Sequence, residues 1–126
     1  MSADKFVLDT NFILDYLKGV SAPARFLAGK NDSELWISDI TRLELLSFPS
    51  LEDAGKKRIE DFLEHVDILP VIETVGDIAI AFRKATRRKL PDSIIAATAV
   101  HLNAVLVTSD KEMLAATFQG LSVIHP

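Results

Sequence analysis

Hydrophobic residues form two kinds of pattern along this chain, and segments with one pattern alternate with segments with the other. Short continuous apolar runs, typical of strands buried on both faces, separate longer segments with apolar residues at helical spacing. The runs predict strands at residues 6–8, 34–38, 67–71, 104–107 and 121–124. The segments between them predict helices at 11–18, 21–28, 39–48, 51–66, 75–85, 91–103 and 111–117. Such alternation predicts an α/β fold, with a mainly parallel sheet of about five strands and helices on both faces.

The helix predicted at 91–103 differs from the others because it is apolar nearly all round. We therefore expect it to be the most buried helix of the fold. The helices at 51–66 and 75–85 instead have apolar residues at helical spacing on one face and charged residues elsewhere, as surface helices do.

Composition narrows the class of protein without deciding it. A chain of 126 residues, 48% hydrophobic and 25% charged, predicts a single globular domain spanning 1–126. The absence of cysteine excludes disulfides and thiolate metal sites. No apolar run approaches the ~20 residues of a membrane helix, and the first residues lack the pattern of a signal peptide. We expect a cytoplasmic protein that does not bind a membrane.

The net charge of −4 argues mildly against a nucleic-acid-binding protein, since such proteins are usually basic. The argument changes if many acids gather in one metal site, because bound cations reverse the local field. Net charge alone therefore leaves the function open.

Four acidic residues stand at positions that join strands to helices, and each has a structural explanation. Asp9 follows the first strand and could cap the next helix, and Asp110 has an equivalent place before the helix at 111–117. Glu44 lies three residues after Thr41, the spacing of a capping box. Asp92 lies in the first turn of the buried helix, where the helix dipole favours a carboxylate.

Considered together, the acids predict a metal site. Asp9 and Asp110 both follow parallel strands and should meet at the carboxyl edge of the sheet, where α/β proteins bind ligands. Carboxylates that converge there would repel one another unless a cation joins them. Oxygen ligands without cysteine or clustered histidine favour Mg²⁺ or Mn²⁺ over zinc. The histidines match no metal-binding spacing and should be structural or solvent-facing: His65, His101 and His125.

Four segments of the chain carry a family resemblance. They are Val7–Asn11, Thr41–Leu45, Leu90–Ala99 and Leu106–Asp110. In these segments, and over essentially its whole length, the chain resembles the PIN-domain family of metal-dependent ribonucleases, and in size the VapC-type toxins of toxin–antitoxin pairs. The resemblance implies a three-layer α/β/α fold with a mainly parallel sheet.

The resemblance also implies roles for particular residues. It makes Asp9, Glu44, Asp92 and Asp110 the catalytic, Mg²⁺- or Mn²⁺-binding residues of an endoribonuclease. Asn11 and Thr108 would support them by orienting the carboxylates or the attacking water. The implied partners are an RNA substrate, an antitoxin protein and a second copy of the chain in a homodimer.

Two further features have two interpretations each. The basic residues Arg83, Arg87 and Arg88 could form a solvated helix end or contact RNA phosphates, and Arg42 could contact RNA or pair with a nearby acid. Abundant apolar residues between Phe12 and Phe48 could be ordinary core or a groove for a helix of the antitoxin.

Three other functions remain as alternatives. One is a PIN-like RNA-processing nuclease outside any toxin–antitoxin pair, and another is a non-catalytic scaffold that binds RNA or protein. A phosphatase with an aspartate nucleophile would need a second Asp two positions after Asp9, where this chain has Asn11.

Overall fold

A computed structural model describes residues 4–126 of the chain. Its strands are β1 (Lys5–Leu8), β2 (Glu34–Ser38), β3 (Asp67–Leu69), β4 (Val105–Val107) and β5 (Ser122–Ile124). Its helices are α1 (Thr10–Leu17), α2 (Ser21–Ala28), α3 (Asp39–Leu46), α4 (Asp53–Leu63), α5 (Glu73–Thr86), α6 (Leu90–Leu102) and α7 (Lys111–Ala115). Each predicted strand and helix is present.

The five strands form one sheet in the order β3-β2-β1-β4-β5, and all neighbouring pairs are parallel. The central strand β1 pairs with β2 on one side and with β4 on the other, so Val7 is aligned with both Trp36 and Leu106. Strands that are far apart in the sequence therefore end beside one another at the same edge. The α/β class and the parallel sheet are confirmed.

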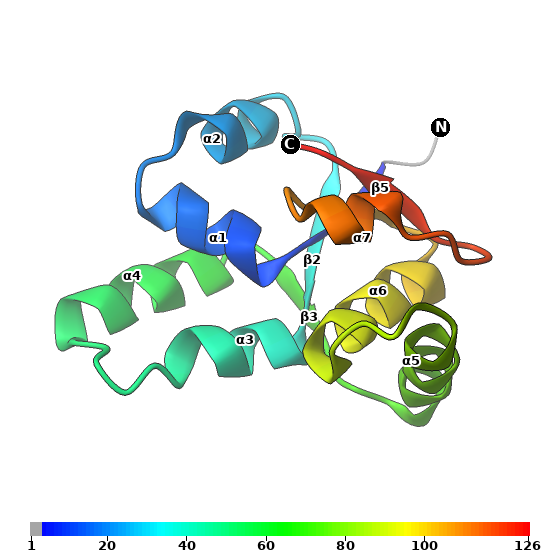
Figure 1. The fold of residues 1–126 in the computed structure, drawn as a ribbon. Helices are drawn as coiled ribbons and strands as arrows, with labels where there is room; N and C mark the ends of the chain where they lie inside the picture. Colours follow the sequence, from blue (N-terminus) through cyan, green and yellow to red (C-terminus); the bar gives the residue numbers. More distant parts are fainter. Residues whose placement is uncertain (1–3) are drawn as a thin grey trace.

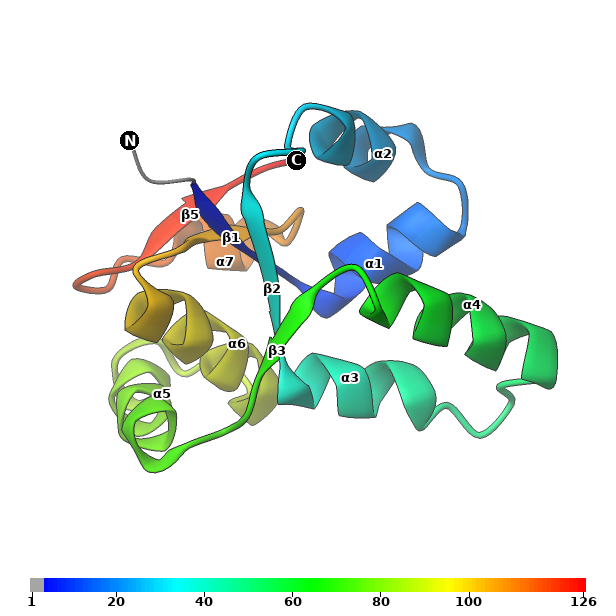
Figure 2. The same ribbon diagram turned by 180° about the vertical axis from the view of Figure 1, so that it is seen from behind.

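Helices cover both faces of the sheet, as Figures 1 and 2 show from opposite sides. Because side chains of a strand alternate between faces, Phe6 and Leu8 pack in one hydrophobic cluster with Phe12 of α1 and Phe62 of α4. Val7 points the other way, into a second cluster that contains residues of α5, α6 and α7. The molecule is thus a three-layer α/β/α structure.

Helix α6 carries more buried residues than any other helix within residues 4–126, as its all-round apolar pattern predicted. Buried residues occupy several sides of it: Ser93, Ile95, Ala96, Ala97, Thr98 and Ala99. It packs against the sheet and against α5, which covers it from outside (Figure 1).

Several helices are shorter than their hydrophobic pattern predicted, and the backbone explains where they end. Helix α4 begins after Glu52, whose backbone is extended, and ends at Leu63. Helix α5, in contrast, extends past both ends of the predicted range 75–85, and it ends at Thr86 because Arg87 adopts a left-handed conformation with φ of 60°, which no helix can continue.

The part of the chain that the structure describes contains no helix long and apolar enough to cross a membrane. The expectation about the first residues falls partly on residues 1–3, which lie outside the described range.

Candidate active site

The ends of two neighbouring strands bring Asp9 and Asp110 to one edge of the sheet. Strand β1 ends at Leu8 and β4 at Val107, and these two residues are paired. The backbone N–H of Asp9 extends this pairing by donating to the carbonyl oxygen of Val107 at 3.2 Å. The edge is the carboxyl edge, as the sequence predicted, because both strands run in the same direction.

Asp9 has both of its carboxylate oxygens engaged. Oδ1 accepts a hydrogen bond from the backbone N–H of Asn11 at 3.2 Å, which caps helix α1. Oδ2 accepts a hydrogen bond from the hydroxyl of Thr108. Asn11 therefore orients this carboxylate through its backbone, while the residue itself is exposed.

Thr108 connects Asp9 to Asp110. It is fully buried, and its Oγ1 also accepts from the backbone N–H of Asp110 at 3.1 Å. Asp110 Oδ1 in turn caps helix α7 by accepting from Glu112 N–H and Met113 N–H at 2.9 and 3.3 Å. Asp9 and Asp110 are thus both helix caps, and each keeps a second oxygen that faces another side chain of this edge.

Glu44 is not part of a capping box, so that explanation is wrong. Ser38 caps helix α3 instead, with its Oγ accepting from Ile40 N–H at 3.2 Å. Glu44 Oε1 accepts a hydrogen bond from Thr10 Oγ1 at 2.8 Å, and Thr10 Oγ1 also lies 3.0 Å from Thr41 Oγ1. These contacts hold Glu44 against the residue that follows Asp9.

Asp92 shares an arginine with Asp110. Arg88 Nη2 donates to Asp92 Oδ2 at 2.8 Å and to Asp110 Oδ2 at 2.6 Å. Arg88 Nη1 donates to Glu112. The Arg88 side chain is only 14% exposed, so this guanidinium is enclosed among three carboxylates.

The backbone around Arg87 directs Arg88 toward these acids. After the left-handed Arg87, Arg88 N–H donates to Thr86 Oγ1 at 3.3 Å, and Thr86 Oγ1 donates to the carbonyl oxygen of Phe82 at 2.8 Å. The sequence left Arg88 either in a solvated helix end or in contact with RNA phosphates, and neither interpretation included its pairing with acids. The helical spacing rule for residues four apart gave no signal for the pair Arg88–Asp92, because Arg88 lies in the connection before α6 and not in the helix.

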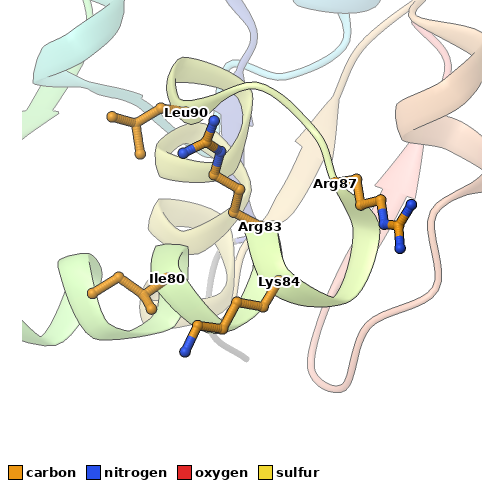
Figure 3. Close-up of a pocket in the computed structure, with 5 residues that line it drawn as sticks. All are labelled: Ile80, Arg83, Lys84, Arg87 and Leu90. Atoms are coloured by element: carbon orange, nitrogen blue, oxygen red, sulfur yellow. The ribbon is translucent and has the colours of Figure 1, made fainter.

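The other basic candidates lie elsewhere. Arg83 and Arg87 line a surface pocket of about 440 Å³ together with Ile80, Lys84 and Leu90. Figure 3 shows Arg83 extending toward Leu90, while Arg87 points away from the other side chains.

Arg42 pairs with an acid on its own helix. Its Nε lies 2.5 Å from Asp39 Oδ1, and its Nη2 lies 3.3 Å from Asp39 Oδ2. The hydrogen bond to Asp39 raises the pKa of Arg42. Of the two interpretations of Arg42, pairing with a neighbouring acid is the one that these contacts favour.

The acids at the sheet edge influence one another electrostatically. Burial raises the pKa of the Asp9 carboxyl above its usual value, although the hydrogen bonds from Thr108 and Asn11 oppose this. The negative charges of Asp92 and Asp110 raise the pKa of Asp9 further. Asp9, Asp92 and Asp110 are therefore close enough for their charges to interact.

Arg88 responds to the same charges in the opposite direction. Burial alone would lower its pKa, but Asp92, Asp110 and Glu112 outweigh this, so the pKa of Arg88 is raised. The guanidinium is thus a permanent positive charge among these acids.

The donor atoms at this edge suit a hard divalent cation, because they are carboxylate and hydroxyl oxygens. Within residues 4–126, however, no three acidic or histidine side chains are grouped so that they could hold one metal ion. Two of the four acids are engaged with Arg88, and the three histidines are all exposed. The residues match the chemistry of a magnesium or manganese site, with an arginine between two of them.

The raised pKa of Asp9 predicts a pH effect on stability. The folded state binds the Asp9 proton more tightly than the unfolded state, so the contribution of Asp9 to stability is fully present below the unfolded pKa and is lost as pH rises through the folded pKa. We therefore expect Asp9→Asn to raise the melting temperature of the EDTA-treated protein at about pH 7, and less so at about pH 4. Asparagine also caps helices as well as aspartate does.

Thermal unfolding followed by circular dichroism at both pH values checks this prediction. Asp77→Asn, at an exposed position of α5, controls for the loss of one negative charge. A melting temperature of Asp9→Asn below that of the wild type near pH 7 would contradict it.

Comparisons with known proteins agree with this architecture. The structure is similar to VapBC2 from Rickettsia felis bound to a promoter DNA fragment, with a TM-score of 0.82, 22% identity, and coverage of 96% of this chain and 98% of that chain. It is similar to a toxin–antitoxin complex from Klebsiella pneumoniae, with a TM-score of 0.79, 26% identity and 95% coverage of each chain.

VapBC-1 from nontypeable Haemophilus influenzae is also similar, with a TM-score of 0.79, 26% identity, and coverage of 96% of this chain and 97% of that chain. No curated protein matches the sequence. The sequence pattern of the PIN domain family, in contrast, matches residues 6–119. Because this match spans most of the chain, the protein belongs to the PIN domain family.

Proposed function

We propose that this protein is a Mg²⁺- or Mn²⁺-dependent endoribonuclease and the toxin of a VapBC-type toxin–antitoxin pair. The observation that carries the proposal is a chain of contacts that joins three of the acids: Thr108 contacts the Asp9 carboxylate and the backbone N–H of Asp110, and Arg88 contacts both Asp110 and Asp92. Membership of the PIN domain family and the likeness to toxin–antitoxin structures support it.

The four acids have separate roles in this proposal. Asp9, Glu44 and Asp92 would hold one ion, directly or through water, and Asp110 would hold a second ion or act through solvent. A bound ion supplies an activated water and stabilises negative charge on the phosphate. Thr108 holds the Asp9 carboxylate through its hydroxyl, and Thr10 holds Glu44. These two threonines would keep the carboxylates in position to hold the ion.

The RNA backbone needs positive charge beside the acids, because the chain as a whole is negative. Arg83 and Arg87 are the best candidates, since the pocket that they line includes Leu90, which shares the first turn of α6 with Asp92. Arg88 and Arg42 are already engaged by acids, so we assign them no contact with RNA in the metal-free protein.

An antitoxin would be the protein partner, as the known structures of toxin–antitoxin complexes suggest. Most apolar residues of the first half belong to the core, including Phe12 and Leu45, but Leu43 and Phe48 are both 47% exposed. This exposed apolar surface at and after α3 supports the binding of an antitoxin segment. We also propose a homodimer and a cytoplasmic location, which follow from the family resemblance and from the absence of a membrane-length apolar run in the sequence.

The test is cleavage of a mixed pool of RNA by the purified full chain. We expect internal cleavage with Mn²⁺ or Mg²⁺ and none after EDTA treatment. Expression of the chain alone in bacteria should arrest growth if it is a toxin. Cleavage without growth arrest would favour an RNA-processing nuclease outside a toxin–antitoxin pair.

One observation favours a second candidate, a scaffold that binds RNA or protein without cutting it. Arg88 already neutralises charge on Asp92 and Asp110, so these acids have a cation without any metal. If RNA stays intact with either metal ion while the chain still binds it, this candidate replaces the nuclease.

A further inference from the structure

Arg88 lies between two of the proposed metal ligands. One of its nitrogens, Nη2, contacts a carboxylate oxygen of both Asp92 and Asp110, at 2.8 and 2.6 Å. A divalent ion shared by these acids would require the same two oxygens or their neighbours. Two cations cannot share these oxygens at such distances without strong repulsion.

The guanidinium of Arg88 is buried, but not all of its hydrogen-bond donors have a partner. Its side chain is only 14% exposed, yet its Nε is buried and has no hydrogen-bond partner among residues 4–126. A buried donor without a partner is costly. The unpaired Nε makes this position of Arg88 less favourable than one in which every donor is hydrogen-bonded, and this favours its exchange for another cation.

The structure also provides an alternative position for the Arg88 side chain. Arg88 lies between α5 and α6 in the connection formed by residues 87–89, and its side chain can therefore move without unwinding a helix. Arg88 Nη1 contacts Glu112, whose side chain is 79% exposed and which is not one of the proposed metal ligands. Glu112 can keep the guanidinium after Asp92 and Asp110 release it.

We propose that Arg88 is an internal counter-cation of the acidic site, which holds Asp92 and Asp110 in the metal-free protein and is displaced when a divalent ion binds them. This inference rests on the proposed function, because it takes these acids as metal ligands. It makes Arg88 a positioning residue that sets the metal affinity of the site. The enzyme would stay ordered but inactive until the concentration of the ion is high enough to displace the arginine.

The competition between Arg88 and a metal ion for these acids can be measured as a change in metal affinity. When only a fraction of a protein is competent to bind, its apparent affinity falls by that fraction. If Arg88 occupies the acids in about nine molecules of ten, removing it tightens metal binding about tenfold. Removing a purely structural arginine would have the opposite effect, because loosened carboxylates bind an ion less well.

The first experiment is calorimetric titration of Mn²⁺ into the EDTA-stripped, dialysed full chain. We expect Arg88→Met to bind Mn²⁺ about tenfold more tightly than the wild type. Lys89→Met removes the same charge from the adjacent exposed position and should change the affinity by less than about threefold. Equal or weaker binding by Arg88→Met, with the wild type binding normally, overturns the inference and leaves the proposed function intact.

A failure of the proposed function gives a different result. If neither the wild type nor Arg88→Met binds Mn²⁺, and RNA is not cleaved, both the metal site and the competition are wrong. Binding by Arg88→Met alone would support the competition in its strongest form.

A second experiment needs no variant and so does not depend on Arg88→Met folding. In nuclear magnetic resonance spectra of the wild type, Mg²⁺ should shift the Nε–H signal of Arg88. The Nε–H signal of Arg42, which is paired with Asp39, serves as the internal reference and should stay in place. An unchanged Arg88 signal, while backbone signals of Asp9 report that the ion has bound, overturns the inference.

Discussion

Asp92→Asn is expected to abolish RNA cleavage while leaving the fold intact. The substitution keeps the shape of the side chain in the first turn of α6 but removes one negative charge from the acids at the sheet edge. Changing a residue that merely supports a metal ligand costs about 10–100-fold in affinity or activity. Loss of Asp92, a proposed ligand, should therefore lower cleavage by about 100-fold or more, measured as the initial rate on labelled RNA with Mn²⁺.

The matched control for this variant is Asp53→Asn. Asp53 also lies in the first turn of a helix, α4, and is exposed. Like Asp92→Asn, Asp53→Asn removes a carboxylate that interacts favourably with a helix dipole, but it takes no charge from the sheet edge. We expect Asp53→Asn to cleave RNA like the wild type and to arrest growth on expression, whereas Asp92→Asn should do neither. Wild-type cleavage by a folded Asp92→Asn would remove Asp92 from the site.

Phe82→Ala is expected to have the largest effect on stability. Phe82 of α5 is fully buried in the cluster that contains Val7 and Ile95, and it packs edge-to-face on Phe118 with ring centroids 5.2 Å apart. Truncating a buried phenylalanine typically costs about 3–5 kcal/mol. Since domains are stable by about 5–15 kcal/mol, the melting temperature should fall by about 10–20 °C.

We expect Phe82→Ala to perturb the candidate active site as well as the core. The carbonyl oxygen of Phe82 accepts from the Thr86 hydroxyl that holds the backbone of Arg88, so a cavity here loosens the turn before Asp92. Ile80→Ala on the same helix is the control, because Ile80 is 55% exposed and should change the free energy of unfolding by about 0.5 kcal/mol or less. Urea unfolding measures both variants. A cost below about 1 kcal/mol for Phe82→Ala would contradict the packing described for this cluster.

The candidate site could be predicted only in part. Asp9 and Asp110 were expected at the same edge because each follows an apolar run, and the parallel sheet confirms that part. The family resemblance implied Thr108 as a support of the carboxylates, but it did not say which carboxylate Thr108 contacts, and it did not indicate Thr10. The hydroxyl of Thr108 binds the carboxylate of Asp9, 99 residues away along the chain, and Thr10 binds Glu44, 34 residues away. Such pairs depend on which strands become neighbours, and local patterns do not specify that order.

The contacts of Arg88 could not be predicted from the local sequence either. Its place in a basic run indicated either exposure or phosphate binding, yet the structure encloses it among Asp92, Asp110 and Glu112. The left-handed backbone of Arg87 turns the chain toward these acids. An arginine in this conformation is uncommon, so no propensity argument would have placed the turn there.

The sequence by itself determined the helices and strands, the parallel α/β class and the burial of α6. These features depend on the spacing of apolar residues and on turn and cap residues within a few positions of one another. Only the tertiary structure decided the strand order, which carboxylates Thr108 and Thr10 contact, and the insertion of Arg88 between Asp92 and Asp110. The reason is physical: these contacts join residues that become neighbours only when β1 and β4 pair and the chain packs around them.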